Sequence, residues 1–307
     1  GAALTDLGQV DRRLDGPARL DGRIGWQAGG ALRLDGVEIA AMGAEIAATG
    51  SIEPESEGLP ASGRVTLRAE DLARFAALAG QPLRGRIAAT FEGSAAEGGQ
   101  RLDLSLDAEG RDLATGIADL DRLIAGRLDL SAEARRTPER IEITGLTLAT
   151  PQLDLTARGD GAGGPVQLSA RLADLGLFLP EFPGAATAQG TVALNGPEAR
   201  RITLALDARG PGGTTARLSG DVLDHGARLD LGAAGQLPLA LVNGAIRPNA
   251  LSGSARFDLR AEGAPGLAAL SGTVETAGAR ASLPGAGLAI DDLSGTARLG
   301  AGRVVTD

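Results

Sequence analysis

Short stretches in which aliphatic and polar residues alternate recur along the whole chain. The segment 102–107 reads Leu-Asp-Leu-Ser-Leu-Asp, and the segment 202–207 reads Ile-Thr-Leu-Ala-Leu-Asp. Side chains point alternately to the two faces of a β-strand, so each segment has one aliphatic face and one polar face. The pattern predicts about twenty such strands in series. Together they would form one long sheet with a continuous aliphatic side.

We expect one set of aliphatic residues to face inward and to line that side of the sheet. Its members are Leu67, Leu102, Leu104, Leu106, Leu128, Leu130, Ile141, Ile143, Leu153, Leu155, Leu168, Ile202, Leu204, Leu206, Leu229, Leu231, Phe257 and Leu259. The intervening polar residues, such as Asp103 and Asp107, should then face water. A register slip of one residue would invert a whole strand, so the expectation can be tested strand by strand.

The connections between the expected strands are short and rich in glycine, asparagine and proline, as at 195–197 and 263–266. Such connections are too short for parallel crossovers, so they favour antiparallel hairpins. Helix is expected only as one or two turns, at 71–78, 118–124 and 174–179. The predicted fold class is therefore all-β: an elongated antiparallel meander that curves into a U-shaped hydrophobic groove.

The chain also repeats itself at a period of roughly a hundred residues, as stacked repeat architectures do. The strand at 65–69 is followed by Asp71-Leu72, and the strand at 166–170 is followed by Asp174-Leu175. A third, shorter copy opens at Leu237. We expect one continuous β-region over 1–307, with approximate repeat units 64–163, 164–235 and 236–307.

Composition narrows the choice of architecture and partner. Hydrophobic residues make up 43% of the chain, which excludes disorder by composition, but aromatic residues make up only 2%. So little aromatic area favours an open sheet over a closed sandwich. The net charge is −9 and the 30 basic residues are scattered arginines, so a nucleic-acid partner is not expected.

Several classes of chemistry lack the residues that they require. The chain has no cysteine, no lysine and a single histidine, His225, in an expected turn. It therefore lacks the means for a His- or Cys-ligated metal cluster, a Walker-A lysine or a serine triad. Gly159, Gly161 and Gly164 match a dinucleotide-binding spacing, but a strand is expected after them where that motif needs a helix. We expect no enzyme activity, no catalytic residue, no metal and no cofactor.

The C-terminal part carries a recognisable order of motifs. These are Leu-Pro-Leu-Ala-Leu-Val-Asn at 237–243, Leu-Ser-Gly-Ser-Ala at 251–255, Leu-Ser-Gly-Thr-Val at 270–274 and Gly-Leu-Ala-Ile-Asp-Asp-Leu-Ser-Gly-Thr at 287–296. This order resembles that of the TamB/AsmA-like family of translocation and assembly module subunits. The dispersed Asp-Leu and Leu-x-Gly elements upstream extend the resemblance over essentially the whole chain. The family's terminal signature regions are not present in this sequence.

The resemblance implies a periplasmic trough (a β-taco) that carries phospholipid between the inner and outer membranes and supports outer-membrane biogenesis. It also implies that the chain is an internal piece of a protein tethered to the inner membrane. The membrane anchor would lie outside this piece, and the outer-membrane assembly partner would contact regions outside it. The expected ligands are phospholipid acyl chains on the aliphatic set. Two alternatives remain: a scaffold for outer-membrane protein (autotransporter) assembly with an Omp85-type partner, and a structural β-solenoid.

Overall fold

A computed structural model describes residues 19–26, 30–54, 56–138, 141–159, 164–180, 182–195, 200–244, 246–300 and 302–306. Contacts within the chain divide it into two compact units, Gly1–Gly163 and Gly164–Asp307, which are described in turn.

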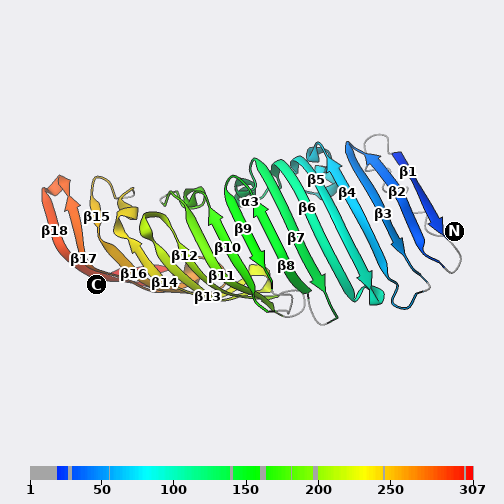
Figure 1. Ribbon diagram of the computed structural model, residues 1–307. Helices are drawn as coiled ribbons and strands as arrows, with labels where there is room; N and C mark the ends of the chain where they lie inside the picture. Colours follow the sequence, from blue (N-terminus) through cyan, green and yellow to red (C-terminus); the bar gives the residue numbers. More distant parts are fainter. Residues whose placement is uncertain are drawn as a thin grey trace. The chain divides into compact units, whose positions relative to one another are not determined.

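The described part of the first unit is an antiparallel meander in which each strand pairs with the next along the chain (Figure 1). Its strands are β1 (Arg19–Trp26), β2 (Leu32–Ala41), β3 (Ala44–Ile52), β4 (Ala61–Ala69), β5 (Arg84–Ala96), β6 (Arg101–Ala114), β7 (Arg127–Arg136), β8 (Ile141–Ala149) and β9 (Leu153–Arg158). Helical turns η1 (Leu72–Phe75) and α2 (Ala76–Ala79) follow β4, η2 (Glu97–Gly99) follows β5, and α3 (Ala118–Leu123) follows β6.

The second unit follows the same plan. Its strands are β10 (Val166–Leu172), β11 (Ala186–Asn195), β12 (Arg201–Arg209), β13 (Thr215–Leu223), β14 (Arg228–Pro238), β15 (Ala250–Ser252), β16 (Ser254–Gly263), β17 (Leu270–Leu283), β18 (Leu288–Gly300) and β19 (Arg303–Thr306). The turns are η3 (Leu175–Leu177), η5 (Pro211–Gly213), η6 (Asp224–Gly226), η7 (Leu239–Gly244), η8 (Leu267–Ala269) and η9 (Pro284–Ala286). Strands β15 and β16 both pair with β17, so they act as one interrupted strand.

The prediction of an all-β antiparallel meander is confirmed, with nineteen strands among the described residues. Helix occurs as short turns at the three expected places, in η1 with α2, in α3 and in η3. The expectation that helix is confined to these places is wrong, because short helical turns also form at η2, η5, η6, η7, η8 and η9, mostly where glycine or proline lies between two strands. The strand expected after Gly164 is β10, so the dinucleotide-binding reading has no helix to support it. The turn that holds His225 is η6.

The turn after β4 in the first unit and the turn after β10 in the second unit have the same local structure. Both η1 and η3 begin in the motif Asp-Leu-x-x-Phe, at Asp71 and Asp174. The Asp71 carboxylate accepts a hydrogen bond from the backbone N–H of Ala73 at 3.0 Å, and Asp174 accepts one from Gly176 at 2.9 Å. Each carboxylate thereby caps a turn that would otherwise leave its first N–H groups unsatisfied. The repeat seen in the sequence is thus also a repeat of local structure.

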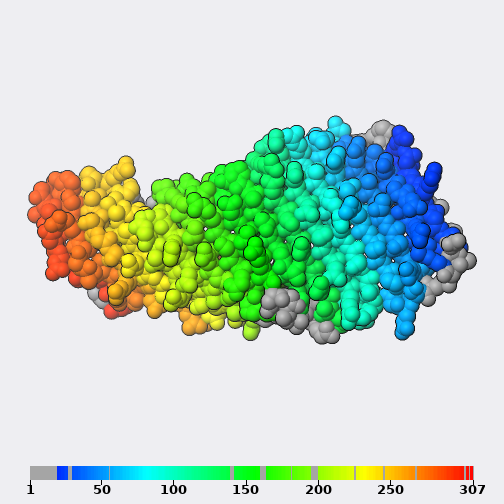
Figure 2. Space-filling model, viewed as in Figure 1, coloured from blue at the N-terminus to red at the C-terminus, as the bar shows by residue number. Residues whose placement is uncertain are grey.

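In each unit the described strands form one layer, and no described helix lies across the viewed face (Figures 1 and 2). The chain exposes 19545 Å² of surface, whereas a compact monomer of 30.8 kDa would expose about 12,000 Å². Among the described residues, the buried hydrophobic side chains are alanines together with Ile124 and Leu128, and no large side chain falls below 2% exposure. A single layer in each unit explains these values, because no second layer of described residues covers either face.

Two strands of the second unit depend on glycine for their path. Gly220 in β13 has φ +133°, and a Cβ placed there would lie 2.1 Å from the carbonyl oxygen of Asp230. Gly190 in β11 has φ +156°, and its Cβ would lie 2.0 Å from the carbonyl oxygen of Ala205. Any side chain would therefore collide with the backbone of the neighbouring strand. These glycines let the strands bend without breaking the ladder.

The described part of the chain contains no helix with the length and apolar character needed to span a membrane.

Candidate functional site

The register of the first unit gathers the aliphatic residues on one face, which we call the apolar face of the unit. Cross-strand partners in an antiparallel pair lie on the same face, so each row of partners crosses the sheet. One row is Val65, Phe91, Leu106, Ala132, Leu146 and Ala157, and the next is Leu67, Ala89, Ala108, Leu130, Leu148 and Leu155. Both rows are hydrophobic throughout, from β4 to β9.

The second unit has an apolar face of the same kind. One of its rows is Leu168, Gly190, Leu206, Leu218, Ala233, Leu259, Gly272 and Leu299. The row beside it is Val192, Leu204, Gly220, Leu231, Ala261 and Leu270. Alternation within each strand is thus converted by the register into an aliphatic surface several strands wide.

The structure places the predicted lining residues on these two apolar faces. Most are half-buried, and Leu128, at 7% exposure, is the most buried of them. Ile141 opposes Arg136 in the ladder, but its side chain lies outside the described set. The intervening residues Asp103 and Asp107 are exposed, as expected.

Leu104 lies on the apolar face, as the alternation predicts, but it is the most exposed of the predicted lining residues whose side chains are described. Its side chain is 51% exposed. The reason is its neighbours: Leu104 is flanked in the ladder by Gly93 and Ala134, and Gly93 is followed by Gly63. These partners offer little side-chain area against which a leucine can pack. The strand alternation therefore predicts the face of a residue, whereas its burial depends on side chains from other strands.

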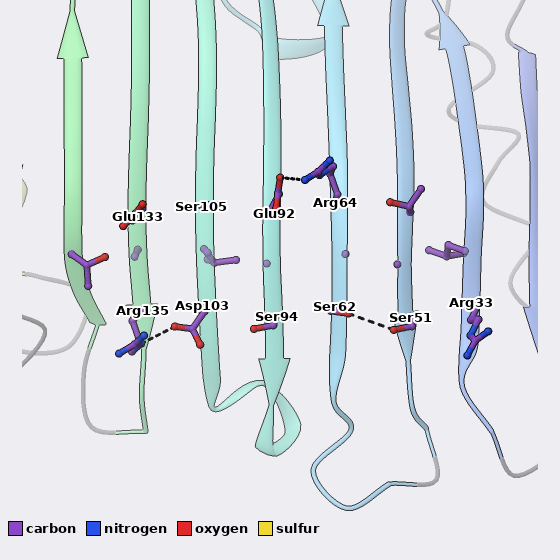
Figure 3. A pocket seen from close by; sticks show the side chains of 18 of the residues that line it. Arg33, Ser51, Ser62, Arg64, Glu92, Ser94, Asp103, Ser105, Glu133 and Arg135 are labelled. Atoms are coloured by element: carbon purple, nitrogen blue, oxygen red, sulfur yellow. Dashed lines mark hydrogen bonds and ion pairs between the residues drawn. The ribbon is translucent and has the colours of Figure 1, made fainter.

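The opposite, polar face of the first unit carries a hollow of about 740 Å³ that the sequence did not predict (Figure 3). Serines and charged residues of β2 to β7 surround it. Arg64 pairs with Glu92 at 2.5 Å, and Arg135 pairs with Asp103 at 2.7 Å (Figure 3). The serines of the hollow come from different strands, so only the register brings them together. Its charges largely neutralise one another, and all of these ion-pair side chains are substantially exposed.

The pKa values that shift among the described residues have a structural explanation. A side-chain hydrogen bond from Arg127 lowers the pKa of Asp129, and one from Arg280 lowers the pKa of Asp291. Backbone hydrogen bonds, first from Gly184 and then from Gly176, lower the pKa of Asp174. These carboxylates belong to strand ladders or capped turns. Their shifts stabilise the ionised form and do not suggest an acid or base held ready for catalysis.

In the described ranges, no three histidine, cysteine, aspartate or glutamate residues come together in a way that could hold a metal ion. The feature that distinguishes this molecule is therefore the pair of uncovered aliphatic faces. Comparison of the chain with protein-family models, with curated proteins and with solved structures finds no match.

Proposed function

We propose that the apolar face of each unit binds the acyl chains of phospholipids, and that the protein carries phospholipid between the inner and outer membranes. The observation that supports this proposal is the continuous, uncovered aliphatic surface, with exposed members such as Phe91 at 45% and Val65 at 38%. Soluble monomers rarely leave so large an apolar surface exposed unless it binds something.

The chemistry of the face suits an alkyl chain better than a folded protein partner. Leucine, alanine, valine and isoleucine dominate the rows, and they give a surface with few of the aromatic and arginine anchors usual at protein interfaces. Each methylene of a bound chain would gain about 0.8 kcal/mol when fully buried. Binding by area needs no specific polar group, so a chain could move along the rows. This property is the one that a conduit requires.

The proposal includes a place in the cell. A conduit of this kind would work in the periplasm, tethered to the inner membrane and acting with an outer-membrane assembly partner, through regions outside this chain. It would act without catalysis, cofactor or metal. The resemblance to the TamB/AsmA-like family in the motifs at 237–243 and 287–296 supports this assignment.

The direct test is to purify the chain under mild conditions and identify what it carries by mass spectrometry of an organic extract. We expect diacyl phospholipids in amounts comparable to the protein, and none bound to a control protein purified from the same cells. A photoreactive amino acid at Phe91 or Leu206, both on the apolar face, should crosslink to lipid. The same probe at Ser105 or Thr203, on the polar face, should not. A chain free of lipid whose apolar-face probes give no lipid adduct would contradict the proposal.

A second candidate function is a scaffold for outer-membrane protein assembly, in which a client strand adds to a sheet edge. The observation in its favour is the outer edge of β18. Its partner β19 covers only Ala297–Gly300, and among the described residues no strand pairs with the outer side of 288–296. Open edges of this kind accept added strands. The third expectation, a β-solenoid, is less compatible with hairpins in a single layer, because a solenoid fills its own core.

A further inference from the structure

One charged residue interrupts the aliphatic rows of the first unit. In the register of the described strands of that unit, Arg136 is the only charged residue on the apolar face. It is the last residue of β7 and continues the alternation that begins at Leu128. Its partners in the ladder are Leu102 on one side and Ile141 on the other. In the ladder, the cationic Arg136 therefore lies between two aliphatic residues.

The surroundings of Arg136 leave its charge available. Arg135, the residue before it, points to the opposite face and pairs with Asp103 (Figure 3). Arg136 is exposed, and among the described residues no carboxylate forms an ion pair with it. An exposed guanidinium without an ion-pair partner among the described residues thus lies at the margin of the apolar face.

We propose that Arg136 receives the phosphate of a phospholipid whose acyl chains lie on the apolar face. This inference rests on the proposed function and names the group by which the lipid is selected. A guanidinium matches the geometry of a phosphate with two parallel N–H donors, and a charge-assisted bond of this kind is roughly twice as strong as a neutral one. A neutral lipid with the same chains would gain only the apolar contact.

The location at the end of β7 fits an amphiphile. The rows of the apolar face run across the strands, whereas Arg136 lies where the strand meets the β7–β8 turn. A lipid bound there would place its chains over Leu102 and the rows beyond it, and its head group toward the solvent at the strand end. Head-group binding at this margin would orient the lipid without placing a charge in the middle of the aliphatic surface.

The experiment offers the purified chain mixed vesicles that contain equal amounts of phosphatidylglycerol and diacylglycerol with identical acyl chains. The protein is then re-isolated and the ratio of the two bound lipids is measured by mass spectrometry. We expect an enrichment of about tenfold for the phospholipid. Arg136→Gln should bring the ratio close to that in the vesicles while total bound lipid remains. Arg136→Lys should keep part of the enrichment.

The matched control is Arg135→Gln, which removes the same charge from the neighbouring residue on the polar face. It should leave the enrichment unchanged, and an equal loss in this variant would overturn the proposal. An unchanged ratio in Arg136→Gln would also overturn it, while the bound lipid would still support the proposed function. Glycerol phosphate at millimolar concentration should not compete. Full competition would mean a site for free phosphate and not for a lipid. A wild-type chain that binds neither lipid would reject the proposed function itself.

Discussion

Leu104 and Ser105 are neighbours in β6, yet they lie on opposite faces of the sheet and face opposite environments. Leu104 belongs to the apolar face and its side chain is half exposed. Ser105 belongs to the polar face, where its ladder partners are Glu92 and Glu133. A substitution at Leu104 can therefore test the function of the apolar face without a large change in the stability of the fold. A change at Leu104 removes little packing, because little packing is there.

We predict that Leu104→Arg lowers lipid crosslinking at the adjacent rows by about tenfold, since it places an unpaired charge where acyl chains must lie. Circular dichroism should remain that of the wild type. Ser105→Arg is the control: its new charge faces two glutamates on the polar face, so lipid crosslinking should not change. Equal crosslinking in both variants would remove the apolar face from consideration as the lipid-binding surface.

Asp174 gives a second prediction at the scale of a single residue. Its carboxylate accepts hydrogen bonds from the N–H groups of Gly184 at 2.7 Å and Gly176 at 2.9 Å, which lower its pKa below the ordinary value of 3.8. A lowered pKa in the folded state means that the unfolded state binds the proton more readily. The stability from this carboxylate is therefore complete above its ordinary pKa and is lost as the pH falls through the lower folded value.

Asp174→Asn should accordingly flatten the acid side of the stability curve. The test is urea unfolding from pH 7 to pH 3, in the wild type and in the variant. The difference between them should be constant near neutrality and shrink below about pH 4, the region of a free aspartate. A difference that grows as the pH falls would show that the charge of Asp174 does not stabilise the turn.

At the scale of the element, the strands of the second unit depend on where glycine lies. Gly220→Ala should lower the free energy of unfolding by about 1–3 kcal/mol. The new Cβ would collide with a carbonyl oxygen, and the backbone of Gly220 has a positive φ that residues with a side chain rarely adopt. Gly232→Ala in β14 is the control, since a Cβ there would meet only the carbonyl oxygen of Ser219, at 3.8 Å. Thermal unfolding of the two variants measures the difference. Equal midpoints would show that β13 can follow its path without the glycine.

The elements also show what the sequence could and could not predict. The alternation in 102–107 and 202–207 predicts strands and faces correctly, because a period of two has only one structural reading over six residues. Arg136 was missed as a member of the apolar face, although the alternation from Leu128 through Ala134 leads to it. The polar hollow could not be predicted, because its serines meet only through the register of several strands.

At the scale of the whole molecule, the uncovered faces should be measurable by calorimetry. Folding buries the difference between about 45,000 Å² for the unfolded chain and 19545 Å² for the native one, against about 33,000 Å² for a compact protein of this mass. The heat capacity change of unfolding follows the area exposed. We predict a value about three-quarters of that of a compact protein of the same length.

Scanning calorimetry of lipid-free protein gives the value directly, from the heat-capacity difference between the native and unfolded baselines. Addition of phospholipid should raise it toward the compact value, because bound chains cover the apolar faces. A soluble head-group compound that carries no acyl chain serves as the control and should leave the heat capacity change of unfolding unaltered. A lipid-free value equal to that of a compact protein would mean that the faces are covered by the chain itself.

The pairing of each strand with its immediate neighbours also bears on how such a chain can change over evolutionary time. Removal or duplication of one hairpin would leave the remaining ladders able to pair again, since no strand depends on a distant one. A single extra strand, in contrast, would reverse the direction of every strand after it within the unit and move the capped turn after β4 and the helical turn α3 after β6 to the other edge. Gene duplications that keep the fold should therefore add strands two at a time. Each such step would widen a sheet by about 9.6 Å, twice the spacing of neighbouring strands.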